Sequence, residues 1–223
     1  MEVVVLTRSA RPDGAARLAR ALAHAGLHVT LATHPRHESG DLGCEGIRVV
    51  EIPDWPPVIP PDDEPAWTLQ FNAAMVARAA SLDLEADVIH VVGWQLTWAA
   101  ASLKGLLSVP VVATLPDLTV DRTSAGTAAF VHQAQWWLTF EARRVLVASA
   151  RRAALLERSF DLPEGKVAVV RHGARLGERM TQLYRKCIVE EREHHRQTDA
   201  GRPALRAQIE RSLQAAAQAE RPA

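Results

Sequence analysis

Cysteine is scarce in this sequence, and its scarcity limits the kinds of site that the chain can build. Among 223 residues there are two cysteines, Cys44 and Cys187, whose separation fits no metal-binding or redox motif. Such cysteines are typical of unpaired thiols in a reducing compartment. No apolar run approaches the roughly 20 residues of a membrane-spanning helix, and the N-terminus lacks the features of a signal peptide. We therefore expect a soluble, cytoplasmic protein with no transmembrane segment.

The sequence also has no net charge and few recognisable motifs. Lys and Arg together number 26, as do Asp and Glu, so nothing attracts nucleic acid or anionic lipid globally, although a local patch is compatible with this balance. There is no G-x-S-x-G, no C-x-x-C and no P-loop. The pair His194 and His195 has no further donor at metal-ligand spacing. We expect no metal, no cofactor and no nucleic-acid partner.

What the chain does have is apolar sequence, 48% of the total, which is enough for a substantial core. Its organising stretch, Asp87–Thr119, contains an apolar run, Val88–Val92, an alanine-rich segment with helical spacing, and a second run, Val111–Leu115. Buried parallel strands are continuously apolar, so this stretch predicts strand, helix and strand. Ligands of open α/β sheets bind outside the carboxyl ends of the strands, and the site is expected there.

The same alternation of strand and helix continues up to Val170 and predicts the fold class. Residues 1–175 are expected to form a single Rossmann-like, doubly wound parallel sheet with its first strand, Val3–Leu6, at the centre. The other strands are expected at His28–Thr33, Ile47–Ile52, Arg144–Ala148 and Lys166–Val170, besides the two in the organising stretch.

Residues 176–223 have a different pattern and are expected to form a helical tail. Apolar residues recur every three or four positions across Gly177–Ile188, which predicts an amphipathic helix that packs back on the domain. Gly201 and Pro203 are expected to interrupt it before a last helix with a thinner apolar stripe, and the final residues are expected to fray.

Six residues within or after the predicted strands are candidates for substrate binding: Asp13, Gly14, His90, Trp94, Asp117 and Arg122. The turn at Gly14 could hold a phosphate or sugar oxygen on backbone amides, although one glycine is far from a dinucleotide-binding fingerprint. His90, inside a strand, is more typical of a hydrogen-bonded core residue than of a catalyst. Trp94 is equally compatible with a pocket wall and with the core. No catalytic residue is predicted.

A third group of residues mixes aromatic rings with cations: Trp136, Trp137, Phe140, Arg143 and Arg144. Such a mixture would suit a membrane surface. Packing of the helix on the sheet is the commoner explanation for a tryptophan pair, so this group does not by itself predict a function.

Three segments resemble the N-terminal, acceptor-side half of a family 4 glycosyltransferase of GT-B fold, close in pattern to glycogen and sucrose synthases. DVIHVVGWQLTWAAASLKGLLSVPVVAT resembles the family's D-V-I-H-A-H-D-W … L-G-V-P-V-V-A-T. HQAQWWLTFEARRVLVASARRAALLERSFDLPEGKVAVVRHGARL is similar to its E-W-W … E-A-D-R-V-I-A-x-S … K-V-x-V-I-P-N-G-V-D. GAARLARALAHAGLHVTLAT resembles its first helix and second strand. The likeness spans residues 2–175 and implies a domain that holds the sugar acceptor.

Several departures from the family pattern bear on activity. The glycine pair of the first turn is Asp13-Gly14 here, and the second His and the Asp of H-A-H-D-W are Val92 and Gly93. The resemblance implies that the His of T-x-H, which holds the donor sugar in the family, is replaced by Pro116. Proline offers neither a hydrogen-bond donor nor an ionisable group.

The resemblance also implies that the donor-binding half is missing. The N-G-V-D position is occupied by residues 172–175, and the chain then enters Gly177–Ile188, which is similar to the helix with which family members end. The leading hypothesis is therefore a glycosyltransferase-like subunit that keeps the acceptor side only, is inactive alone, and binds a glycan or a protein partner. The alternative is a split glycosyltransferase completed by a donor-binding subunit. A nucleotide-binding module, which rests on the Gly14 turn alone, is a third hypothesis.

Overall fold

The computed structural model describes residues 1–8, 14–35, 45–52, 63–118, 126–171 and 173–219, with side chains as far as Thr198. These residues belong to two compact units, Met1–Ile188 and Val189–Ala223. The first unit contains the sheet and the helices that cover it. The predicted site residues Asp13 and Arg122 lie outside the described residues.

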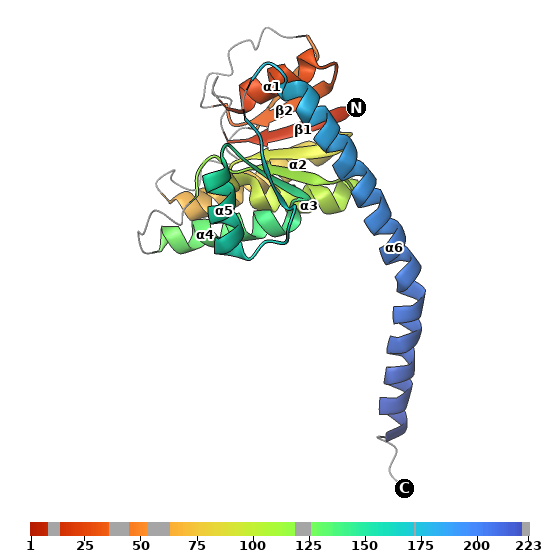
Figure 1. Ribbon diagram of the computed structural model, residues 1–223. Helices are drawn as coiled ribbons and strands as arrows, with labels where there is room; N and C mark the ends of the chain where they lie inside the picture. The colour runs from red at the N-terminus through yellow and green to blue at the C-terminus, as the bar shows by residue number, and fades with distance from the viewer. Residues whose placement is uncertain (9–13, 36–44, 53–62, 119–125, 172, 220–223) are drawn as a thin grey trace. The chain divides into compact units, whose positions relative to one another are not determined.

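Seven parallel strands form one sheet in the order β3-β2-β1-β4-β5-β6-β7. Figure 1 shows β1 beside β2 in this sheet. β1 pairs with β2 on one side and with β4 on the other, so the first strand is internal, as predicted. This is the Rossmann order, and it confirms the predicted fold class. The strands are β1 (Glu2–Thr7), β2 (His28–Thr33), β3 (Ile47–Glu51), β4 (Val88–Val92), β5 (Val111–Thr114), β6 (Arg144–Val147) and β7 (Val167–Val169).

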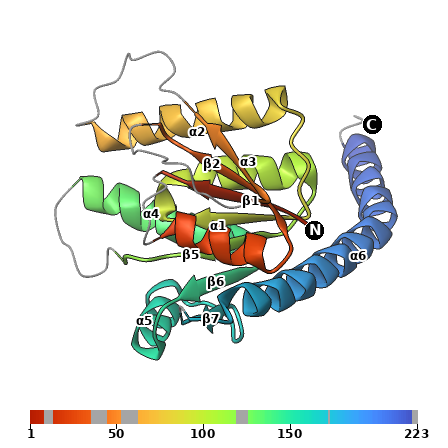
Figure 2. The ribbon, with the colours of Figure 1, turned by 90° about the horizontal axis from the view of Figure 1, so that it is seen from above.

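Helices cover both faces of the sheet (Figure 2). On one face lie α1 (Ala15–His24) and the beginning of α6 (Leu176–Ala219). On the other face pack α2 (Glu64–Ser81), α3 (Thr97–Leu107), α4 (Thr127–Glu141) and α5 (Ala150–Phe160), with the short 3-10 helix η1 (Trp94–Leu96) in front of α3.

The central strands β1, β4 and β5 are largely apolar because both faces of the sheet are buried there, whereas the edge strands β3 and β7 carry exposed residues. In β1, Val3 and Val5 belong to the core beneath α1 and α6, whereas Val4 and Leu6 belong to the core beneath α2 to α5. Successive side chains of a strand point to opposite faces, so a strand covered on both sides cannot alternate polar and apolar residues. The continuous runs seen in the sequence are the direct result.

Local signals set the ends of several helices. The Ser149 side chain accepts a hydrogen bond from the Arg152 amide at the start of α5 and so caps that helix. Gly26, with φ of 82°, follows the last residue of α1 and its C-cap, a position that favours glycine. At the end of α3, Ser108 adopts the left-handed conformation with φ of 55°.

The predicted interruption of the tail at Gly201 and Pro203 is wrong, because α6 is one continuous helix from Leu176 to Ala219. An internal proline costs a helix about 3 kcal/mol, but it removes only one backbone donor. The residues that come after it are mostly Ala, Leu, Arg, Gln and Glu, which are strong helix formers. The two compact units divide inside this helix, after Ile188, rather than in front of it.

The first turns of α6 pack closely on α1. Leu176, Met180, Tyr184 and Cys187 are buried in the core that α1 shares with the sheet. Gly177 permits this approach: a Cβ at that position would overlap the carbonyl oxygen of Ala21 and lie 2.9 Å from the Cβ of Ala25. Helix propensity alone would favour alanine over glycine here, so the contact explains the glycine.

This contact predicts that two glycine-to-alanine substitutions, both inside helices, change the free energy of unfolding in opposite directions. Gly177→Ala should lower the free energy of unfolding by about 1–3 kcal/mol, because the added methyl group forces α6 away from the α1 backbone. Gly105→Ala, in α3 with open space around the added atom, should raise it by about 0.5–1 kcal/mol. Urea denaturation of the two variants and the parent measures both changes. Stabilisation by both substitutions would show that α6 does not pack on α1.

Candidate functional site

A cavity of about 270 Å³ lies at the carboxyl ends of β4, β5 and β6, on the face of the sheet that α1 and α6 cover. This is the edge at which the sequence predicted a site. The lining comes from strand ends, from the starts of three helices and from the segment after β7. It consists of Gly14, Leu18, His90, Val92, Thr114, Leu115, Pro116, Leu146, Val147, Ala148, Arg152, Val170, Leu176 and Met180.

Most of this lining is apolar, and the polar groups are few and specific. Leu18 of α1 and Met180 of α6 face the strand ends across the cavity. Arg152, in the first turn of α5, is the one permanently charged residue of the described lining, and its guanidinium donates a hydrogen bond to the carbonyl oxygen of Pro116. None of the described lining residues is an Asp or a Glu. The cavity can therefore bind an apolar body and a polar or anionic group.

His90 is fully buried, and both nitrogens of its ring are hydrogen-bonded. Nδ1 lies 2.5 Å from the Tyr184 hydroxyl and Nε2 lies 2.8 Å from Thr114 Oγ1. Burial disfavours the charged imidazolium and lowers the pKa of His90 from 6.5 to about 3. The ring is neutral at physiological pH, with one nitrogen donating and the other accepting. The prediction of a hydrogen-bonded core residue is confirmed, although the ring also borders the cavity.

Tyr184 joins the tail to the sheet. It is fully buried, packs edge-on against the His90 ring at a centroid separation of 5.8 Å, and lies 94 residues away in the sequence. Burial, with a smaller contribution from Cys187, raises the pKa of the Tyr184 phenol, so it is a neutral hydrogen-bonding group. The sequence placed Tyr184 on an apolar helical stripe but gave no sign of its partner.

The structure brings together two of the six predicted binding residues, Gly14 and His90, which line the same cavity. Trp94 is buried on the opposite face of the sheet, edge-on to Phe130, and does not line it. Asp117 is exposed, and its backbone carbonyl accepts a hydrogen bond from the Gln135 amide at 3.0 Å. The binding roles of all six residues stay predictions.

Sequence reasoning missed Thr114, Arg152 and the two α6 residues of the lining. Thr114 ends β5 on the same face as Val112, so its position relative to His90 could have been inferred from the alternation of side chains along paired strands. Arg152 stands in the first turn of the helix that follows β6, a place that always adjoins the carboxyl edge of a parallel sheet. Leu176 and Met180 depend on where α6 docks, which no local pattern indicates.

No helix in the described part of the chain combines the length and hydropathy needed to cross a membrane. Among the same residues, His, Cys, Asp and Glu side chains do not gather in groups of three or more that could hold a metal ion.

The sheet order and the position of the cavity define one Rossmann-like domain of the kind that GT-B glycosyltransferases contain. Residues 14–178 match the model of glycosyltransferase family 4, and the chain belongs to that family. Comparison with curated protein sequences found no match.

Solved glycosyltransferase structures share the fold. A segment of sucrose-phosphate synthase from Thermosynechococcus elongatus superposes with a TM-score of 0.63 at 20% identity, covering 83% of this chain and 98% of that one. HepE of Anabaena, in complex with UDP-glucose, gives 0.54 at 17% identity, covering 78% and 44%. The catalytic domain of starch synthase IV from Arabidopsis thaliana, bound to ADP and acarbose, gives 0.55 at 14%, covering 78% and 52%. The chain thus spans about half the length of the last two structures.

The buried His90 predicts a pH dependence of stability. The unfolded chain takes up a proton on His90 as the pH falls through 6.5, whereas the folded chain does not until about pH 3. Stability is therefore lost as the pH falls from 6.5 towards 3, by at most about 1.4 kcal/mol per pH unit for this group. In His90→Gln this contribution is absent. Between about pH 7.5 and pH 4.5 the variant should lose roughly 2.5–3 kcal/mol less than the parent.

The measurement is urea denaturation at a series of pH values. At neutral pH His90→Gln should be less stable by about 1–3 kcal/mol, because the amide cannot satisfy both hydroxyl partners with the same geometry. His28→Gln makes the same chemical change at an exposed position and serves as the control. Parallel stability curves for His90→Gln and the parent would contradict the burial of a neutral His90.

Proposed function

We propose that this chain supplies the acceptor side of a glycosyltransferase, and that it acts by binding a sugar acceptor in the cavity at the ends of β4, β5 and β6. The chain by itself binds the acceptor and does not transfer a sugar to it. It works as a non-catalytic or partner-dependent subunit. The observation behind this proposal is the lining of the cavity. It offers a cation, a threonine and apolar walls, but no group suited to the chemistry of transfer.

Sugar transfer from a nucleotide-sugar makes two demands on a site. Cationic or backbone donors must stabilise the departing diphosphate, and a group must take the proton of the attacking hydroxyl. In the cavity, Arg152 already donates to the Pro116 carbonyl. His90 has both ring nitrogens bonded and a pKa of about 3, which makes it a very weak proton acceptor. These features favour binding over catalysis.

The backbone near the cavity supports an oxygen-rich ligand. Gly14 precedes α1 and lines the cavity, and no described side chain caps the N-terminus of that helix. Unpaired amides at a helix start favour phosphate or hydroxyl oxygens. This is the turn that the sequence analysis singled out.

The alternative is a split glycosyltransferase, in which a donor-binding subunit completes the site. It is favoured by one observation. Between β7 and α6 the chain has only residues 170–175, so no second domain is inserted at that point. In that case the cavity would hold the acceptor while the donor is bound by the partner.

A binding titration tests the proposal. Maltose and maltotriose, added to the isotope-labelled chain, should shift the NMR resonances of the Gly14 and Ala148 amides. Ala148→Phe should abolish these shifts, because an exposed alanine of the lining becomes a ring that occupies the cavity. Ala80→Phe, at an exposed position of α2, is the matched control. Absence of shifts, or shifts that persist in Ala148→Phe, would reject this cavity as the acceptor site.

Sugar transfer by the isolated chain is tested in a separate experiment. The isolated chain should release no UDP from UDP-glucose in the presence of these saccharides, and Pro116→His should not restore release. A single side chain does not replace the positioning of the donor, which supplies much of the rate enhancement. Release that begins only when a donor-binding domain is added would favour the split enzyme. Turnover by the purified chain alone would overturn the proposed non-catalytic role.

A further inference from the structure

The two tryptophans of α4 have different surroundings. Trp137 is half-buried, with its ring 6.2 Å from that of Trp98 and its Nε1 3.2 Å from Glu141 Oε1. Trp136 is 48% exposed and Phe140 is 68% exposed, and their rings stack at 6.1 Å with an interplanar angle of 19°. The expected packing on the sheet therefore applies to Trp137 only. Trp136 and Phe140 form an aromatic pair on the outside of the domain.

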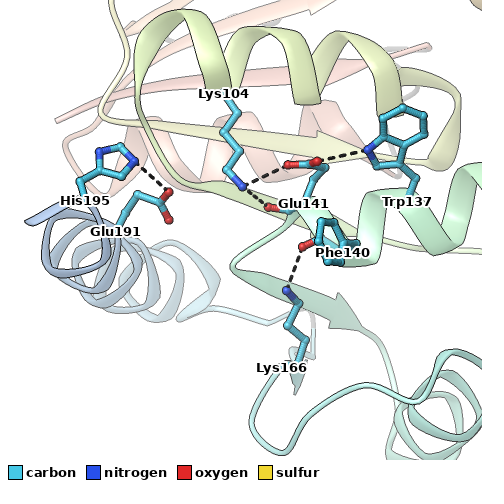
Figure 3. A network of polar contacts seen from close by, with 7 residues as sticks. All are labelled: Lys104, Trp137, Phe140, Glu141, Lys166, Glu191 and His195. Atoms are coloured by element: carbon cyan, nitrogen blue, oxygen red, sulfur yellow. Dashed lines mark hydrogen bonds and ion pairs between the residues drawn. The ribbon is translucent and has the colours of Figure 1, made fainter. Parts of the chain in front are cut away.

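Two lysines lie near the end of α4, beside Phe140 and Glu141 (Figure 3). Lys166 Nζ lies 3.2 Å from the carbonyl oxygen of Phe140, and Lys104 Nζ lies 3.1 Å from Glu141 Oε2. Arg143 and Arg144 come after Ala142, the C-cap of α4. We name six residues the aromatic–basic surface: Trp136, Phe140, Lys104, Arg143, Arg144 and Lys166.

The cations of this surface are close enough to repel one another. The pKa of Lys166 is lowered to about 8, first by partial burial and then by Arg143, Lys104 and Arg144, while Glu141 opposes the change. The amine of Lys166 is bonded to a neutral carbonyl oxygen rather than to a carboxylate. An anionic ligand would relieve this repulsion and favour the charged amine. Even with the nearby exposed Glu164 counted beside Glu141, four cations stand against two carboxylates.

The two helices that contribute residues to this surface carry a single acidic residue between them. α3 contains neither Asp nor Glu, and the one acidic residue of α4 is Glu141, which is paired with Lys104 and Trp137. Aromatic rings beside Lys and Arg are typical of surfaces that rest at the boundary between lipid headgroups and acyl chains. Cores of protein–protein interfaces are likewise enriched in aromatic residues and arginine, but they are depleted in lysine and in charged residues overall. The two lysines and the excess of cations thus favour anionic lipid over protein as the occupant.

We propose that the aromatic–basic surface docks this domain on an anionic phospholipid surface, with Trp136 and Phe140 entering the headgroup region and the four cations facing lipid phosphates. This surface is at the amino ends of β5, β6 and β7, whereas the cavity is at the carboxyl ends of parallel strands. A docked domain therefore keeps the cavity accessible. Docking of this kind does not depend on the proposed function.

Cosedimentation with vesicles tests this proposal. The 223-residue chain is mixed at about pH 7, where Lys166 is mostly charged, with vesicles of phosphatidylcholine that contain one-third phosphatidylglycerol, or with phosphatidylcholine alone. Partition to the anionic vesicles should be about tenfold stronger or more, and should fall steeply at high salt. Trp136→Ser with Phe140→Ser should weaken it roughly tenfold by removing the apolar contact. Lys166→Gln with Arg143→Gln should weaken it at least about fivefold at low salt.

The control makes the same kinds of change on α2, where Leu69 is 46% exposed and Arg78 is exposed. Leu69→Ser with Arg78→Gln should leave partition unchanged, and thermal unfolding verifies that every variant is folded. Absence of binding to anionic vesicles at low salt would overturn the proposal. Binding that is equally strong in the Trp136 and Phe140 variant would overturn it too. Self-association that this variant abolishes, without vesicle binding, would instead assign the surface to a protein contact.

Discussion

The hydrogen bonds of the buried His90 ring connect three parts of the fold that are distant in the sequence. One nitrogen is paired with Thr114 of the neighbouring strand and the other with Tyr184 of α6. A buried imidazole is tolerated only when its polar atoms have partners, and α6 supplies one of them. The docking of α6 therefore fixes the environment of a strand residue, the wall of the cavity and the covering of one face of the sheet. Each of these depends on the close approach at Gly177.

The parallel sheet separates two kinds of surface. At the carboxyl ends of the strands, successive loops diverge and leave a cavity lined by residues from several elements. At the amino ends, helices return to the sheet, and the residues at these junctions include Lys104, Arg143, Arg144 and Lys166. A chain with no net charge can thus still present a local basic region. The equal numbers of acidic and basic residues exclude a strong electrostatic potential over the whole molecule, but they do not exclude a local basic region.

Family membership and proposed activity rest on different observations. The match over residues 14–178 and the Rossmann order establish the family and the fold. The activity depends on individual side chains, and here Pro116 and the hydrogen-bonded His90 line a cavity whose described residues include no carboxylate. Fold is shared by proteins with many functions, and the residues of a site distinguish among them. The proposed binding role rests on those residues rather than on the family.

The sequence by itself determined the sheet, its strand order and the positions of most elements. Buried parallel strands must be apolar on both faces, so runs such as Val88–Val92 can be recognised in the amino-acid sequence. Glycines, serines and prolines restrict the backbone locally, so caps such as Ser149 can be recognised there too. The sequence also indicated the edge of the sheet at which a cavity forms. It predicted a break at Pro203 that the continuous helix does not have, because propensity is a weak prior for a single position.

Only the tertiary structure decided which side chains meet. Tyr184 and His90 are 94 residues apart, and no periodicity records that they pair. The same is true of Trp136 and Trp137, adjacent in sequence and both aromatic, one exposed and one half-buried against Trp98. Consecutive residues of a helix point about 100° apart, so the rotation of α4 on the sheet, set by packing of the whole core, chooses which ring faces outward. Long-range packing therefore completes the site that local patterns only locate.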